Sequence, residues 1–191
     1  MAHVLENEFL AKAEEILDVI ARSPRCKQMV KGFMAEYHLE KILNDLKAQR
    51  ALVAVERLDA DGLPDFRVSS EVGEYLVECK MVMSARPYAN GDFRVDFQRT
   101  RNSPADPLSR YYKKGDFDIV AACLYNQTAK WEFRFIGTRD LPVDEKVGKN
   151  CLKKALRYPG GLPWRESLIP LVSSRAAAVA PVGIHVRRRT G

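Results

Sequence analysis

Hydrophobic residues near the start of the chain recur every three or four positions, a spacing that predicts amphipathic helices. In residues 5–22 one side of such a helix would carry Leu5, Phe9, Leu10, Ala13, Leu17 and Ile20. Ser23 and Pro24 interrupt this pattern, because proline does not continue a helix. Residues 27–48 fit a second helix.

Shorter apolar or alternating runs follow the helices and predict strands. The expected strands cover residues 51–58, 65–68, 75–83, 92–98, 118–125 and 131–136. Residues 108–114 and 150–158 fit short helices, and Pro159-Gly160-Gly161 would end the second of them. The order of elements predicts an α/β fold.

Length and composition favour one folded domain. The chain has 191 residues, of which 46% are hydrophobic, enough for a core of its own. We expect this domain to cover residues 1–174 and a basic, loosely ordered tail to cover residues 175–191, which end in the run Arg187 to Arg189. No apolar run approaches the roughly 18 residues of a membrane span, and the acidic N-terminal region does not resemble a signal peptide.

The four cysteines lack the spacing of a zinc site or a CxxC motif. Cys79 and Cys123 lie in apolar runs, so we expect buried thiols and a reducing, cytoplasmic location. No Walker loop or GxGxxG stretch is present, and we therefore expect no nucleotide cofactor.

Charge divides the sequence into two unequal parts. Residues 1–80 hold 11 Lys and Arg against 15 Asp and Glu, a net charge of −4, whereas residues 81–191 hold 20 against 10, a net charge of +10. Acidic groups suit metal binding and basic groups suit a phosphate backbone, so this distribution favours an anionic partner. A solvated surface with uneven charge is the alternative.

One expected strand carries charged residues at alternate positions. Glu78 and Lys80 are two residues apart, so a strand points both to the same face and turns Cys79 toward the core. Asp65 opens the preceding strand. A turn centred between residues 71 and 72 would place Asp65 opposite Glu78, and a turn centred one residue later would place it opposite Lys80. Either register brings two acids and a lysine together.

Pro64-Asp65, a gap of 12 residues and then Glu78-Cys79-Lys80 resemble the active-site motif of the PD-(D/E)xK nuclease superfamily. The resemblance covers residues 27–136. It implies a restriction-endonuclease-like fold, which is a central mixed β-sheet with a hairpin of acidic ligands, flanked by α-helices. It also implies that Asp65, Glu78 and the backbone carbonyl of Cys79 bind Mg²⁺, for which Mn²⁺ can substitute, and that Lys80 is catalytic.

Two further polar residues are candidates through the same resemblance. Glu36 lies on an apolar stripe of the second helix and would add a third carboxylate to the metal site. Glu40 is the rival choice, and simple i,i+4 pairing of either glutamate within the helix is the other alternative. Gln98 would position the attacking water or the DNA, or would be an ordinary polar surface residue.

A basic segment with interleaved tyrosines follows. Its candidate DNA contacts are Arg99, Arg101, Arg110, Tyr111, Tyr112, Lys113 and Lys114. Arginine and lysine neutralise phosphates, and tyrosine can stack on bases. A solvated basic loop is the alternative. Asp116 and Asp118, on either side of Phe117, are expected to have structural roles, in which they cap or orient a basic residue.

These features together predict a Mg²⁺-dependent endonuclease that hydrolyses DNA, most simply a restriction or defence nuclease. Alternatives are a Holliday-junction resolvase, a repair or transposon-encoded nuclease, a non-catalytic nucleic-acid-binding module of the same fold, or an unrelated α/β enzyme. RNA stays an alternative substrate. Restriction enzymes usually cut as dimers, so a homodimer is expected, with no membrane association.

Overall fold

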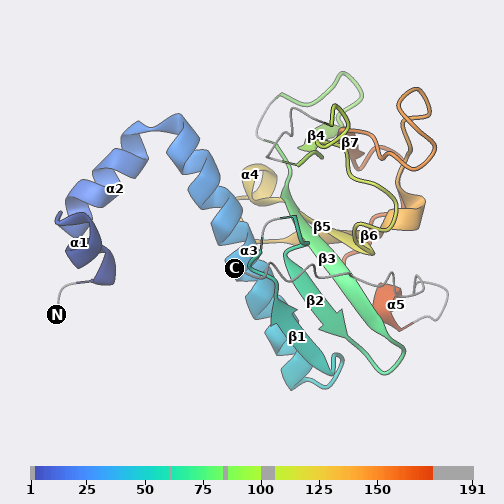
Figure 1. The fold of residues 1–191 in the computed structure, drawn as a ribbon, viewed down its shortest axis with the longest axis horizontal. Helices are drawn as coiled ribbons and strands as arrows, with labels where there is room; N and C mark the ends of the chain where they lie inside the picture. Colours follow the sequence, from blue (N-terminus) through green and yellow to red (C-terminus); the bar gives the residue numbers. More distant parts are fainter. Residues whose placement is uncertain (1–2, 61, 84–85, 100–105, 174–191) are drawn as a thin grey trace.

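The structure is a computed structural model that describes residues 3–60, 62–83, 86–99 and 106–173. Arg101 and the expected basic tail at 175–191 lie outside these residues. The described residues form a mixed α/β fold in which helices flank a central mixed sheet (Figure 1).

The central sheet has five strands in the order β1-β2-β3-β5-β6. Their bounds are β1 Ala54–Arg57, β2 Phe66–Ser69, β3 Glu74–Met81, β5 Ile119–Cys123 and β6 Phe133–Gly137. All neighbouring pairs are antiparallel except β3 with β5, which run parallel. The five predicted strands in these regions are therefore confirmed, with shifted bounds, and β3 lies at the centre of the sheet.

The N-terminal helices differ from the prediction in one respect. Residues 5–22 form two helices, α1 Val4–Phe9 and α2 Ala13–Arg22, because Leu10 adopts a left-handed backbone conformation that ends α1. The long helix α3 covers Pro24–Ala48. Its N-cap is Ser23, whose hydroxyl accepts a hydrogen bond from the backbone N–H of Cys26. Ser23 and Pro24 thus end one helix and start the next.

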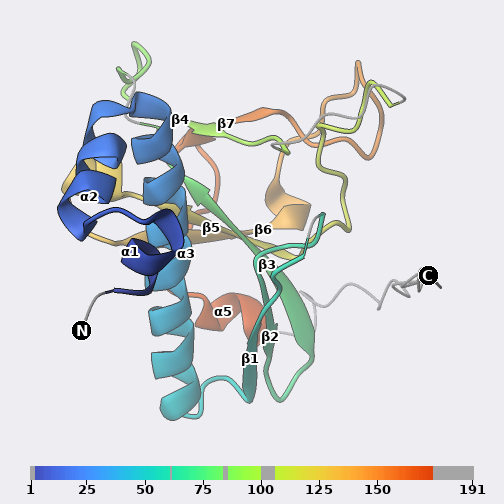
Figure 2. The ribbon, with the colours of Figure 1, turned by 60° about the vertical axis from the view of Figure 1, so that its left-hand side comes forward.

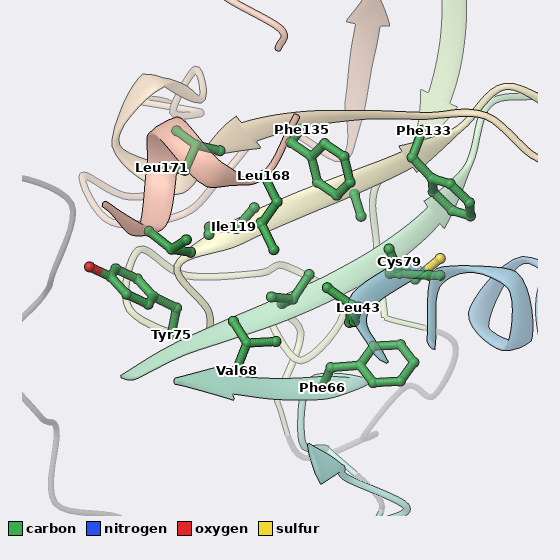
Figure 3. Packing of buried hydrophobic residues seen from close by; sticks show 14 of the residues in the cluster. Leu43, Phe66, Val68, Tyr75, Cys79, Ile119, Phe133, Phe135, Leu168 and Leu171 are labelled. Atoms are coloured by element: carbon green, nitrogen blue, oxygen red, sulfur yellow. The ribbon is translucent and has the colours of Figure 1, made fainter. Parts of the chain in front are cut away.

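One face of the central sheet packs against helices (Figure 3). From α3 the buried residues are Ala35, Leu39 and Leu43, and α5 Ile169–Val172 contributes Leu171 and Val172. The sheet contributes alternate residues such as Phe66, Val68, Tyr75, Val77 and Cys79. Because α5 and the neighbouring Leu168 belong to this core, hydrophobic packing continues beyond the range 27–136 that carries the motif resemblance.

The opposite face of the sheet packs against a second, smaller sheet. This sheet pairs β4 Phe93–Asp96 with β7 Ala155–Tyr158, near the carboxyl end of β3 (Figure 2). The second core includes Val95, Phe97, Tyr112, Phe117 and Leu156. Short helical segments α4 Tyr125–Thr128 and η1 Thr138–Asp140 complete the described elements.

The predicted helix at 150–158 is wrong, since its second half is strand β7. Leu152 and Leu156 have helical spacing, but pairing with β4 buries Leu156 equally well and joins the two strands by backbone hydrogen bonds. Residues 108–114 form turns rather than the predicted helix. Gly160 follows β7 with φ +53°, and a Cβ there would lie 2.5 Å from the Cβ of Arg157, so this turn needs glycine.

None of the helices in the described part of the chain combines the length and the apolar character needed to cross a membrane.

We predict that Leu39→Ala destabilises the fold by about 3 kcal/mol, because it leaves a cavity between α3 and the sheet. Leu39 is 0% exposed. The matched control is Lys47→Ala, at an exposed position on the same helix, which should change the free energy of unfolding by less than about 0.5 kcal/mol. Urea denaturation measures both values. Equal effects would contradict the burial of Leu39 between α3 and the sheet.

Candidate active site

The β2–β3 hairpin brings the motif residues together. Phe66 pairs with Val77 and Ser69 pairs with Glu74, and this register continued by one residue places Asp65 opposite Glu78. This is the first of the two predicted registers. Asp65 Oδ2 also accepts a hydrogen bond of 2.7 Å from the backbone N–H of Cys79. The acid that precedes β2 is therefore tied directly to the middle of β3.

The two faces of β3 have opposite character, as predicted. Tyr75, Val77 and Cys79 point into the core beneath α3. Glu78 and Lys80 point to the other face, where Lys80 Nζ lies 2.5 Å from Glu78 Oε1. Glu78 is buried, so this ion pair supplies the partner that a carboxylate out of water requires.

A third side chain, Tyr112, completes the cluster. Its hydroxyl donates a hydrogen bond of 2.5 Å to Glu78 Oε1. Lys80 Nζ lies 5.3 Å from the centre of the Tyr112 ring, a cation–π contact. Tyr112 is only 7% exposed, so its ring packs inside the protein, which does not suit the predicted DNA contact. No pattern in the sequence indicates this role, because Tyr112 is separated from Glu78 by 34 residues.

The pKa values of the cluster reflect burial and close charges. Burial, followed by the charge of Glu78, raises the pKa of Asp65 to about 7. Burial alone would lower the pKa of Lys80, but Glu78 and the neighbouring Tyr112 and Asp65 outweigh it and raise the pKa well above its usual range. Burial also raises the pKa of Tyr112, with a further rise from Glu78. Lys80 and Tyr112 therefore stay protonated at neutral pH.

Glu36 on α3 lies near this cluster. Burial raises the pKa of its carboxyl, which is also influenced by the charges of Lys80 and Glu78. Its Oε2 accepts a hydrogen bond of 2.8 Å from Arg57 on β1. Arg57 also reaches Glu40, at 3.4 Å. Both glutamates thus pair with Arg57 instead of forming the i,i+4 pairs considered from the sequence, and Arg57 is a residue that sequence reasoning missed.

The carboxylates suit a hard cation. Within the described ranges, no three or more His, Cys, Asp and Glu side chains gather closely enough to form a metal site by themselves. Asp65 and Glu78 supply two carboxylates, and their mutual repulsion raises the pKa of Asp65. Mg²⁺ is often held by one or two carboxylates together with substrate phosphates, so this pair fits it. Glu36 as a further ligand stays a prediction, as does the Cys79 carbonyl.

The remaining predicted residues lie around Tyr112 or on the nearby surface. Arg99 is 5.5 Å from the Tyr112 ring centre and forms an ion pair of 2.8 Å with Asp116. Arg110 donates to the backbone carbonyl of Arg99, while Lys154 lies over the ring of Tyr111. Lys113 and Lys114 are exposed.

Three polar residues have structural contacts. Gln98 donates to the carboxylate of Asp96, and its predicted role in positioning water or DNA stays a prediction. Asp116 orients Arg99 and also accepts from the backbone N–H of Lys113, and Asp118 accepts from the backbone N–H of Leu76. The structural roles expected for Asp116 and Asp118 are confirmed.

The chain has a weak structural likeness to a solved protein. The sequence matches no protein-family model and no curated protein significantly. Among solved structures, the chain is similar to the bacterial homing endonuclease I-Ssp6803I, with 23% sequence identity over 57% of this chain and 68% of that chain, and a TM-score of 0.40. A likeness of this size establishes neither the fold family nor the activity of this chain.

We predict that Asp65→Asn stabilises the protein more at about pH 8 than at about pH 4. The pKa of Asp65 is raised from 3.8 to about 7, so between these values the folded chain holds a proton that the unfolded chain releases. Stability of the natural sequence therefore falls as pH rises through this window, whereas asparagine does not ionise. The stabilisation by Asp65→Asn should be about 2 kcal/mol larger at the higher pH than at the lower one, a value that is reduced because Asp65 and Glu78 titrate together.

Urea denaturation in EDTA at the two pH values measures this difference, and Asp116→Asn is the control at a carboxylate that is paired with Arg99. A gain from Asp65→Asn that is the same at both pH values would contradict the raised pKa of Asp65.

Proposed function

We propose that this protein is a metal-dependent endonuclease of the PD-(D/E)xK type that hydrolyses phosphodiester bonds in DNA. The observation that carries the proposal is the convergence of Asp65, Glu78 and Lys80 at one hairpin, with the ammonium group held against a buried carboxylate. Two acids and a protonated lysine are the groups that phosphodiester hydrolysis needs. The central mixed sheet agrees with a restriction-endonuclease-like fold.

Asp65 and Glu78, with the Cys79 carbonyl, would hold Mg²⁺, and Mn²⁺ could replace it. The ion would supply charge neutralisation on the phosphate and a more acidic bound water. Lys80 stays protonated beside Glu78, so its part is to stabilise negative charge on the phosphate rather than to remove a proton from water. Tyr112 donates to Glu78 and helps to hold the carboxylate in place.

The basic residues near this cluster support a nucleic-acid substrate. Arg99 lies beside Tyr112, and the exposed Lys113 and Lys114 follow it along the same segment. Phosphate contacts from such residues would position the backbone over Glu78 and Lys80. We favour a restriction or defence role, with junction resolution, repair and transposition as alternatives. A non-catalytic role is less well supported, since every residue of the motif is present.

The first test compares cleavage of plasmid, linear and four-way-junction DNA with Mg²⁺ and with EDTA. Cleavage should need the metal, and Asp65→Asn, Glu78→Gln and Lys80→Met should each lower its rate by at least about 100-fold. The matched control is Glu56→Gln, which removes an exposed carboxylate that pairs with Arg67 and should leave the cleavage rate unchanged. Cleavage that survives in Glu78→Gln would refute the assignment. Discrete bands, junction cutting or smears would separate the alternative roles.

The second test concerns DNA binding. The double variant Lys113→Ala/Lys114→Ala should bind DNA more weakly, and the slope of log affinity against log salt should become shallower by about 1 for each of the two lysines that binds a phosphate. Fluorescence anisotropy in EDTA at several salt concentrations measures this slope. Lys47→Ala, at the far end of α3, is the control. An unchanged slope would show that Lys113 and Lys114 do not contact the phosphates of DNA.

A further inference from the structure

Helices α1 and α2 and the first part of α3 form an arm that touches the rest of the molecule through Lys31, which donates a hydrogen bond of 3.0 Å to Asn126 Oδ1 and lies over the ring of Tyr125. We define the helical arm as residues 4–34, which include α1, α2 and the first part of α3, and the body as the described residues from 35 onward. Figures 1 and 2 show α1 and α2 beside α3 and away from the central sheet. No residue of the helical arm is buried. The first buried residue of α3 is Ala35, where the helix reaches the sheet.

The helical arm is nevertheless rich in large hydrophobic residues. Those that are exposed are Val4, Leu5, Phe9, Leu10, Leu17, Val19, Met29, Phe33 and Met34. Met29 and Phe33 are four residues apart and continue to the exposed Tyr37, so they form one stripe along α3. An apolar surface of this kind on a folded domain marks an interaction site. Isolated helices as short as α1 and α2 are also marginal in water, so a partner would stabilise them.

The charges of the helical arm indicate what the partner is. Residues 4–22 hold five acids, Glu6, Glu8, Glu14, Glu15 and Asp18, against Lys12 and Arg22, a net charge of −3. Residues 23–34 hold three bases, Arg25, Lys27 and Lys31, and no acid, a net charge of +3. Among the ion pairs of the described residues, none joins these acids to these bases. The acidic half does not suit DNA or an anionic membrane surface.

We infer that the helical arm is a homodimer interface, in which two copies pair through a two-fold axis. In such a pairing the acidic α2 of each copy meets the basic start of α3 in the other, and the stripe of Met29 and Phe33 is covered. A two-fold interface requires one surface to be complementary to itself, and the opposite net charges of the two halves provide this. The inference does not depend on nuclease activity, because it rests on the helical arm alone.

Sedimentation velocity of the full chain at micromolar concentrations tests the interface. The natural sequence should be a dimer, and Leu17→Glu or Phe33→Glu should weaken dimerisation by about tenfold or more, because each places a charge in the apolar contact. Val53→Glu is the matched control, since Val53 on the body is 61% exposed and Leu17 is 63% exposed. Circular dichroism of the body's thermal transition checks that each variant folds.

A pair of charge reversals tests self-complementarity more strictly. Glu14→Lys/Asp18→Lys makes both halves of the helical arm basic, and Arg25→Glu/Lys27→Glu makes both acidic. Each variant alone should be largely monomeric, whereas an equal mixture should form a heterodimer, because every contact between copies is again of opposite charge. A monomeric natural sequence, dimers that survive the substitutions at Leu17 and Phe33, or the absence of a heterodimer from the mixture would each overturn the inference.

Discussion

The burial of Glu78 is the constraint on which the arrangement of the candidate site depends. A carboxylate removed from water is costly unless charged and hydrogen-bonding groups surround it. Glu78 meets this need with Lys80 from its own strand and with Tyr112 from the segment before β5. Those contacts fix the face of β3 on which the charged groups lie. They also require the segment that carries Tyr112 to pack closely over that face.

The position of β3 makes this possible. It is bordered by β2 and β5, so its backbone is satisfied on both sides, and only its side chains are left to differ between the faces. The face beneath α3 is apolar and anchors the helix, while the other face carries Glu78 and Lys80. Asp65 joins them because the hairpin register places it opposite Glu78 and the backbone N–H of Cys79 holds its carboxylate.

The body and the helical arm obey different physical requirements. In the body, α3 is held by Leu39 and Leu43 against the sheet, and Glu36 has an ion-pair partner within the chain. The helical arm has no buried residue, and no ion pair of the described residues joins its acidic half to its basic half. One helix, α3, continues through both parts. It therefore connects the proposed dimer interface to Glu36, which lies close to Glu78 and Lys80.

Local patterns in the sequence were enough to predict the strands of the central sheet and the pairing of Glu78 with Lys80. The alternation along β3 has a period of two and needs no distant residue to be interpreted. The sequence left two hairpin registers open, and only the folded sheet selected the one that joins Asp65 to Glu78. Residues 150–158 were misassigned because their partner, β4, is about 60 positions away in the chain.

Tyr112 and Arg57 show the same division between sequence and tertiary structure. Neither is near Glu78 or Glu36 in the sequence, so no spacing could indicate the hydrogen bonds that they donate to these carboxylates. The sequence by itself determined the chemical groups and the face of the strand on which they stand. The tertiary structure decided which partners neutralise them, because burial and long-range contacts arise only when distant segments pack together.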